Sequence, residues 1–181
     1  MLLRVPAGWH CGGENTGFWE LDADDVVEAI KSWKPGPCFA EARFRESLFC
    51  FLENRFRRKN LGKEVQVRRG RADIMITLHG VLGDVGAPVA IELKYNLTST
   101  NEHNRLLGQI SEYIRAKVEL IVVLCGKTKA EFVVGIAAHM GALSGVGRFA
   151  FKGYVIQKAV GRSAESARFL SGNGRRLASA S

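Results

Sequence analysis

The segment that decides the fold of this chain is Pro88-Val89-Ala90-Ile91-Glu92-Leu93-Lys94-Tyr95. Side chains alternate between the two faces of an extended strand, so Ala90, Glu92 and Lys94 share one face. The apolar residues and Tyr95 share the other face. Burying a carboxylate and an ammonium on so apolar a strand is costly unless both have partners. A solvated edge strand is the alternative, but such a strand usually carries more than two polar residues.

A second charged residue in an apolar strand lies upstream, in Arg71-Ala72-Asp73-Ile74. The glycines at 80, 83 and 86 between the two strands favour a long hairpin. Such a hairpin would bring Asp73 and Glu92 together, with Lys94 one step along. Two carboxylates this close repel each other and raise each other's pKa unless a cation lies between them. A bound divalent metal ion resolves this repulsion most simply. The alternative is that Asp73 pairs only with Arg71.

These residues resemble the motif of the PD-(D/E)xK nuclease superfamily, whose members have the restriction-endonuclease-like fold. Asp73 matches the lone Asp, and Glu92-Leu93-Lys94 matches the E-x-K. The chain departs from the name motif at Ala72, where the motif has Pro. The resemblance covers residues from about Phe39 to Gly126. It implies an αβββαβ core and hydrolysis of phosphodiester bonds.

The resemblance also implies roles for individual residues. Asp73, Glu92 and the backbone carbonyl of Leu93 would hold Mg²⁺, for which Mn²⁺ can substitute. Lys94 would orient the attacking water and stabilise developing charge, and it could act as a base if a nearby metal lowered its pKa. Gln109, on the helix after the E-x-K strand, matches a glutamine often found at such sites, with Tyr113 one turn further on. An ordinary exposed helix residue is the alternative for Gln109.

A third acidic residue is expected on the long helix that precedes the strands, where superfamily members often carry a Glu that faces the sheet. At about 100° per residue, the apolar residues of this helix centre on one side. Glu41 falls near the middle of that side, whereas Glu46 and Glu53 fall toward solvent. We therefore place Glu41 at the site, as a catalytic residue and metal ligand. The alternative is that Glu41 only interacts with the helix N-terminus.

The pattern along the chain predicts an α/β fold, with a restriction-endonuclease-like αβββαβ core and a central mixed sheet flanked by helices. We expect an N-terminal arm and short helix packed on the core at 1–38, a nuclease-like domain at 39–158 and a flexible basic tail at 159–181. The predicted helices cover 22–33, 39–58 and 102–117. The predicted strands cover 64–67, 71–78, 88–95 and 120–124, with further strands at 131–137 and 149–156.

Composition favours a polyanionic partner. The 181 residues carry a formal net charge of +8. Arg68, Arg69 and Arg71 lead into the strand that bears Asp73, and we expect them to contact phosphates. A solvated basic surface is the alternative. The four cysteines form no C-x-x-C pair, which argues against zinc ligation. Cys50 and Cys125 lie in apolar runs and are expected in the core. No signal-peptide-like segment or bilayer-spanning apolar run is visible, so the expected location is cytoplasmic.

The sequence therefore predicts a Mg²⁺-dependent nuclease, an endonuclease or exonuclease, with DNA as the favoured substrate. Two alternatives stay open: a nucleic-acid-binding subunit that has lost catalysis, and a protein-interaction subunit on the same fold. A homodimer is also left open. Serine or cysteine hydrolase chemistry has no support, because no G-x-S-x-G motif or Cys/His neighbourhood is present.

Overall fold

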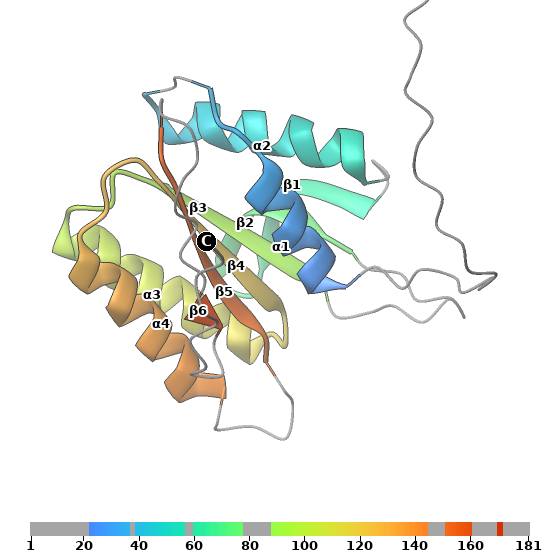
Figure 1. Cartoon of the computed structure of the whole chain (residues 1–181). Coiled ribbons are helices and arrows are strands. Elements are labelled where there is room, and N and C mark those ends of the chain that lie inside the picture. Colours follow the sequence, from blue (N-terminus) through green and yellow to red (C-terminus); the bar gives the residue numbers. More distant parts are fainter. Residues whose placement is uncertain are drawn as a thin grey trace, which may run out of the picture.

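The computed structural model describes residues 22–36, 39–56, 60–77, 88–144, 151–160 and 170–171. It contains a sheet with helices on both faces (Figure 1). The helices are α1 (Ala23–Ser32), α2 (Glu41–Arg55), α3 (Thr100–Arg115) and α4 (Ala130–Ser144). The strands are β1 (Leu61–Val67), β2 (Gly70–Ile76), β3 (Val89–Tyr95), β4 (Glu119–Cys125), β5 (Gly153–Lys158) and β6 (Leu170–Ser171).

The strands lie in the order β1-β2-β3-β4-β5-β6 in one mixed sheet. β1, β2 and β3 pair antiparallel, β3, β4 and β5 pair parallel, and β6 pairs antiparallel with β5. The succession α2-β1-β2-β3-α3-β4 is the αβββαβ order that the sequence predicts. The predicted fold class, an α/β core with a central mixed sheet flanked by helices, is therefore confirmed.

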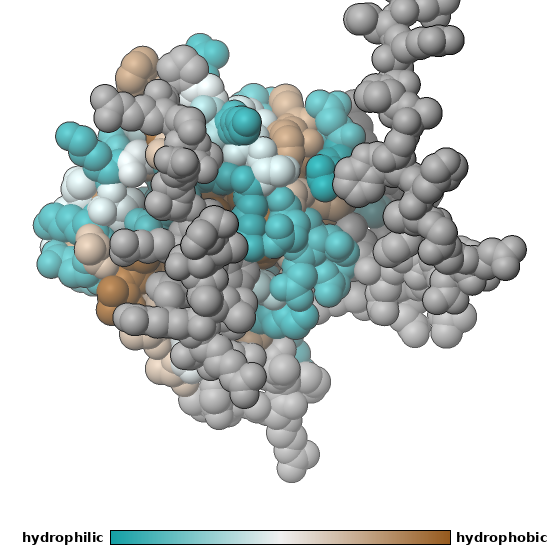
Figure 2. Space-filling model, in the orientation of Figure 1, coloured by the Kyte–Doolittle hydropathy of each residue, from teal (hydrophilic) through white to brown (hydrophobic). Residues whose placement is uncertain are grey.

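Each face of the sheet is covered by one pair of helices (Figure 1). α1 and α2 pack on the face that carries Val89, Ile91 and Leu93, and α3 and α4 pack on the face that carries Ala90. The predicted alternation along β3 is thus confirmed. Glu92 alternates with Ile91 and Leu93 along β3, so its side chain lies on the same face as Ala90, where α3 packs. In Figure 2, hydrophilic residues cover the surface over α1, and hydrophobic residues gather at α4.

The two ends of α1 are fixed by polar contacts. Asp22 and Asp25 form a capping box, in which each side chain accepts a hydrogen bond from the other residue's backbone N–H. At the other end, the buried ammonium of Lys158 donates to the carbonyls of Lys31 and Trp33, at 2.6 Å and 2.8 Å. These contacts join α1 to β5 and anchor the helix on the sheet.

One predicted element has the wrong type. The segment 131–137, which we expected to be a strand, lies within helix α4. Phe132, Val133, Ile136 and Met140 are buried at helical spacing. The physical reason is topological, because parallel strands such as β4 and β5 need a crossover of a dozen or more residues, usually a helix. The last predicted strand, at 149–156, is shifted by a few residues and appears as β5.

One further expectation is corrected, and others lie outside the described residues. Cys50 is exposed on α2, not in the core, whereas Cys125 is buried. In the predicted tail, Leu170 and Ser171 pair with β5, and the flexibility expected of that segment stays a prediction. The arm at 1–20, the glycines at 80, 83 and 86, and the rest of the tail beyond 160 lie outside the described ranges. Within the described part of the chain, no helix has both the length and the apolar character needed to cross a bilayer.

Candidate active site

The side chain of Asp73 lies where β2 and β3 stop pairing. The register of these strands joins Ile74 to Ile91, and one further step puts Asp73 opposite Glu92. At that step the backbone N–H of Leu93 donates to Asp73 Oδ2, at 2.9 Å. The β2–β3 pairing ends at Ile74 and Ile91, so the Leu93 N–H has no backbone acceptor on β2. The Asp73 carboxylate accepts its hydrogen bond in place of a backbone carbonyl. This contact brings Asp73 against the E-x-K segment, as the sequence predicts.

The backbone of Leu93 supplies an oxygen at the same place. The N–H and C=O of one strand residue point to the same edge of the strand. Since the Leu93 N–H points to Asp73, its carbonyl also points toward β2. Asp73, Glu92 and the Leu93 carbonyl therefore border one region at the end of the β2–β3 pairing.

Glu92 and Lys94 form an ion pair that is largely buried. Glu92 is 2% exposed, and its Oε1 lies 2.9 Å from Lys94 Nζ, which excludes the solvated-edge alternative. Burial raises the pKa of Glu92 above its ordinary value, and Asp73 adds to this effect while Lys94 opposes it. Burial lowers the pKa of Lys94, but the surrounding carboxylates outweigh it, so the net shift is upward. The carboxylates around Lys94 therefore favour its ammonium form.

Glu41 reaches the same site from the first turn of α2. Its Oε1 lies 3.4 Å from Lys94 Nζ, and its Oε2 accepts a hydrogen bond from the Tyr95 backbone N–H at 3.2 Å. Glu46, in contrast, pairs with Lys63 at the surface. The predicted orientation of α2 is confirmed for Glu41, which lies toward the E-x-K strand, and for Glu46, which lies toward solvent. It is wrong for Glu53, whose Oε1 atom is buried.

Two charged residues at the site are missing from the sequence prediction. Arg45 Nη1 donates to Asp73 Oδ1 at 3.0 Å, and Arg45 Nη2 lies 3.2 Å from Glu64 Oε1. The hydrogen bond to Asp73 raises the pKa of Arg45. Asp73 therefore pairs with Arg45, and Arg71 pairs with Glu64 at 3.6 Å. The one available signal for Arg45 was its spacing, because residues four apart, such as Glu41 and Arg45, share a helix face.

Helix α3 contributes Tyr113 and, one turn earlier, Gln109. The Tyr113 hydroxyl lies 2.9 Å from Glu92 Oε2 and 3.0 Å from the carbonyl of Arg71. The hydroxyl has one hydrogen for these two acceptors. If Glu92 were protonated, it would donate to the Tyr113 oxygen, and Tyr113 would donate to the Arg71 carbonyl. Burial and Glu92 raise the pKa of Tyr113, so the phenol is neutral.

The position of Gln109 along β3 follows from the position of Tyr113. Since α3 runs back along β3, four helix residues (about 6 Å) correspond to two strand residues, which are about 7 Å apart. If Tyr113 is level with Glu92, Gln109 is thus level with Lys94. The Gln109 Oε1 atom is buried and has no hydrogen-bond partner among the described residues. The alternative of an ordinary exposed residue does not fit this burial.

The three arginines lie at the hairpin between β1 and β2 and just after it. Arg68 and Arg69 form its two-residue turn, and Arg71 follows on β2. The side chains of Arg68 and Arg71 are 55% and 61% exposed, although each lies 3.6 Å from a glutamate, Glu112 and Glu64 respectively. All three guanidinium groups are therefore accessible to a polyanion.

The donors at the site fit a hard divalent cation. Magnesium prefers oxygen ligands and keeps several of its waters, so two carboxylates and one carbonyl are enough protein ligands. Asp73, Glu92 and the Leu93 carbonyl supply that set. In the described part of the chain no cluster of three or more Asp, Glu, His or Cys side chains could hold a metal ion. Metal ligation by Glu41 stays a prediction. In the structure, the oxygens of Asp73 contact Arg45 and the Leu93 N–H, and the oxygens of Glu92 contact Lys94 and Tyr113.

Comparison with known proteins finds a structural similarity but does not assign the chain to a family. No protein-family model matches the chain, and no curated protein matches it either. Among solved structures, the chain is similar to SfsA from Pyrococcus furiosus, solved in complex with Ca²⁺, with 10% sequence identity and a TM-score of 0.36. The match covers 65% of this chain and 58% of SfsA, so the chain spans little more than half of that protein. Similarity at this level says nothing about function.

Proposed function

We propose that this protein is a metal-dependent nuclease that hydrolyses phosphodiester bonds of nucleic acid, with DNA as the favoured substrate. One observation carries the proposal: the hydrogen bond from the Leu93 N–H to Asp73. It gathers two carboxylates and a carbonyl at the end of the β2–β3 pairing, with the Lys94 ammonium 2.9 Å from Glu92. Acids and a lysine in this arrangement suit the hydrolysis of a phosphodiester.

The chain's own residues divide the chemical work. Asp73, Glu92 and the Leu93 carbonyl would hold Mg²⁺. When bound, the ion would neutralise phosphate charge and lower the pKa of a water. Lys94, held as an ammonium by Glu92 and Glu41, would stabilise the charge that develops on the phosphate in the transition state.

Removing one carboxylate tests this function. Asp73→Asn and Glu92→Gln should each abolish cleavage that depends on Mg²⁺ or Mn²⁺, because each change removes one carboxylate of the proposed metal site. The fold should stay intact, because each amide keeps the shape of the side chain and an oxygen that accepts hydrogen bonds. The assay incubates purified protein with plasmid, linear duplex, branched, single-stranded and RNA substrates, with Mg²⁺ or with EDTA. Circular dichroism checks the fold. Wild-type cleavage by both variants would eliminate this site.

A second candidate is a nucleic-acid-binding subunit that has lost catalysis. The observation in its favour is that both carboxylate oxygens of Asp73, and both of Glu92, already have protein partners. Duplex binding in a mobility-shift assay, together with no cleavage of any substrate in Mg²⁺ or Mn²⁺, would favour this candidate. A protein-interaction role would be favoured instead if no nucleic acid bound.

A further inference from the structure

Arg45 contacts two carboxylates at the site through the two terminal nitrogens of its guanidinium group. Nη1 donates to Asp73 Oδ1 at 3.0 Å, and Nη2 lies 3.2 Å from Glu64 Oε1. The Arg45 side chain is 26% exposed, and that of Asp73 is 11% exposed. Since the other Asp73 oxygen accepts the Leu93 N–H, Arg45 is the charged partner of the Asp73 carboxylate.

A metal ion at Asp73 would compete with Arg45. A carboxylate oxygen shared by a divalent cation and a guanidinium brings positive charges within a few ångströms of each other, at a position with little water to screen them. The guanidinium must therefore weaken metal binding or move away when the metal binds.

Glu64 is a second carboxylate partner for Arg45. Its side chain is 42% exposed and already contacts Arg45, so Glu64 is a carboxylate that can hold the guanidinium when it leaves Asp73. Glu64 lies in β1 with a φ of +50°, a left-handed conformation that is uncommon for a residue with a side chain. This backbone conformation carries some strain for a glutamate. In it, the Glu64 carboxylate contacts both Arg45 and Arg71.

We propose that Arg45 is the counter-cation of Asp73, and that a divalent metal ion displaces it from Asp73 onto Glu64. This inference rests on the proposed function, because it assumes that Asp73 binds metal. It assigns Arg45 a positioning role: the residue sets the metal affinity of the site and keeps Asp73 in place when no metal is bound.

Calorimetric titration of the full chain with MnCl₂ tests the proposal. Arg45→Gln should bind Mn²⁺ about tenfold more tightly than wild type, because no cation competes for Asp73. Its metal-free melting temperature should be lower, and saturating Mn²⁺ should close that gap. Lys63→Gln is the matched control, since it removes the same charge from an exposed pair with Glu46. Equal affinities of Arg45→Gln and Lys63→Gln would overturn the proposal.

A second pair of variants keeps the test decisive if Arg45→Gln does not fold. Glu64→Gln should weaken Mn²⁺ binding, because Arg45 loses its second carboxylate and stays on Asp73, whereas Glu46→Gln should not. Unchanged affinity in Glu64→Gln would count against the displacement. A failure of the proposed function would be seen in a different result, because the wild-type protein would then bind no Mn²⁺. In that case, binding by Arg45→Gln would still support Arg45 as the counter-cation of Asp73, and no binding by either would overturn both.

Discussion

At the scale of single residues, the site depends on which oxygen of each carboxylate faces which partner. Asp73 divides its oxygens between Arg45 and the Leu93 N–H, and Glu92 divides its oxygens between Lys94 and Tyr113. Glu41 then provides the third carboxylate, next to Lys94. A motif can name the acids, but it does not show how their oxygens are distributed.

The role of Glu41 leads to a prediction for catalysis. Glu41→Gln should reduce cleavage at low Mg²⁺ more than at saturating Mg²⁺, because it removes a negative charge 3.4 Å from Lys94 and lowers the attraction of the site for a cation. Rates measured across a Mg²⁺ series check this. The control is Glu46→Gln, on the solvent side of the same helix. Loss of activity in the Glu46 variant alone would contradict the prediction.

A prediction for stability concerns Gly126, which follows β4 with a φ of +75°. An added Cβ would lie 2.9 Å from the Tyr95 ring and would also collide with the side chain of Asn96. Gly126→Ala should therefore cost about 1–3 kcal/mol of unfolding free energy. Gly108→Ala is the contrasting control, because nothing lies within 4 Å of its added Cβ in the interior of α3.

The two glycine variants should change stability in opposite directions. A glycine in a helix interior is less stable than alanine by about 0.5–1 kcal/mol, so Gly108→Ala should stabilise the protein. Urea unfolding of both variants measures the two free energies. Equal stability of Gly126→Ala and wild type would show that the β3–β4 end accommodates a side chain there.

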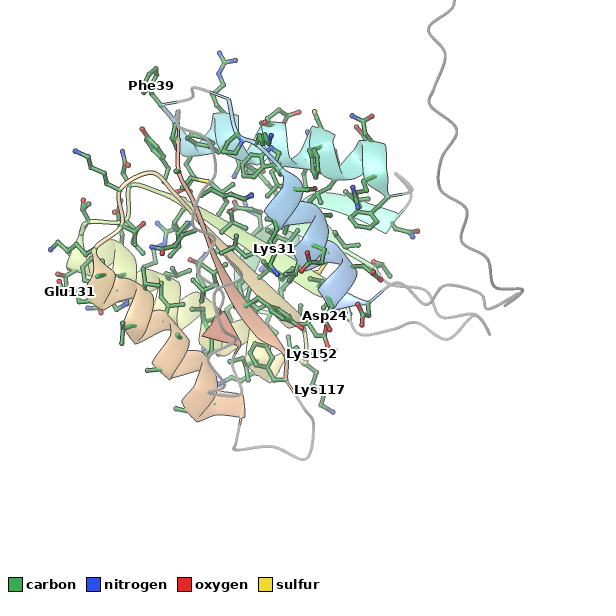
Figure 3. All side chains as sticks on the ribbon, in the orientation of Figure 1. Asp24, Lys31, Phe39, Lys117, Glu131 and Lys152 are labelled. Carbon is green, nitrogen blue, oxygen red and sulfur yellow. The ribbon has the colours of Figure 1, made fainter. Side chains whose placement is uncertain are left out.

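At the scale of elements, α1 meets the start of β4 and β5 through charged groups. Tyr154 OH donates to Asp24 at 2.8 Å, and Lys152 Nζ lies 3.3 Å from the same carboxylate (Figure 3). Glu119, at the start of β4, lies in the same neighbourhood. Burial raises the pKa of Glu119, and Asp22 and Asp24 raise it further while Lys152 opposes them.

This shift predicts a pH dependence of stability. A carboxyl group with a raised pKa binds its proton more tightly in the folded state, so its contribution is fully present below the unfolded pKa and is lost as the pH rises through the folded pKa. Glu119→Gln should therefore raise the melting temperature relative to wild type at pH 7, and the difference should shrink toward about pH 4.5.

The experiment compares thermal unfolding of both proteins at several pH values. Glu131→Gln serves as the control, because Glu131 is exposed on α4 and pairs there with Lys129. A difference between Glu119→Gln and wild type that stays constant with pH would contradict the assignment of the effect to Glu119 titration.

At the scale of the whole molecule, the net charge of +8 favours binding to a polyanion. We expect the hairpin arginines to contribute much of this binding. Arg68→Glu with Arg69→Glu should weaken duplex DNA binding and flatten its salt dependence, because each lost phosphate contact lowers the slope of log K against log salt by about 0.9. Fluorescence anisotropy across a salt series measures the slope.

The control for this charge reversal is the double variant Lys31→Glu with Lys34→Glu at the end of α1, which makes the same change in net charge. A salt slope reduced equally in both double variants would show that only the overall charge matters. A wild-type affinity that does not change with salt would instead favour an acidic protein partner.

The sequence alone determined the order of the elements in the core and the location of the acids. Alternation along Val89–Tyr95 settled which residues face which layer, and the helical period of α2 separated Glu41 from Glu46. Such patterns are local, because strand and helix periods depend on residues a few positions apart. The same local reasoning failed at 131–137, where β-branched residues favour a strand but the parallel β4–β5 connection requires a helix.

Only the tertiary structure decided which groups meet. Arg45, Glu64 and Asp73 come from three elements, and their contact depends on how α2 lies across β1 and β2. Burial, too, is a property of the packed layers: it makes Glu92 a buried acid with a raised pKa, and it leaves Cys50 exposed. Spacing along a chain limits which side chains can share a face, but the distances between charges depend on the packing of all the layers, and those distances set the chemistry of the site.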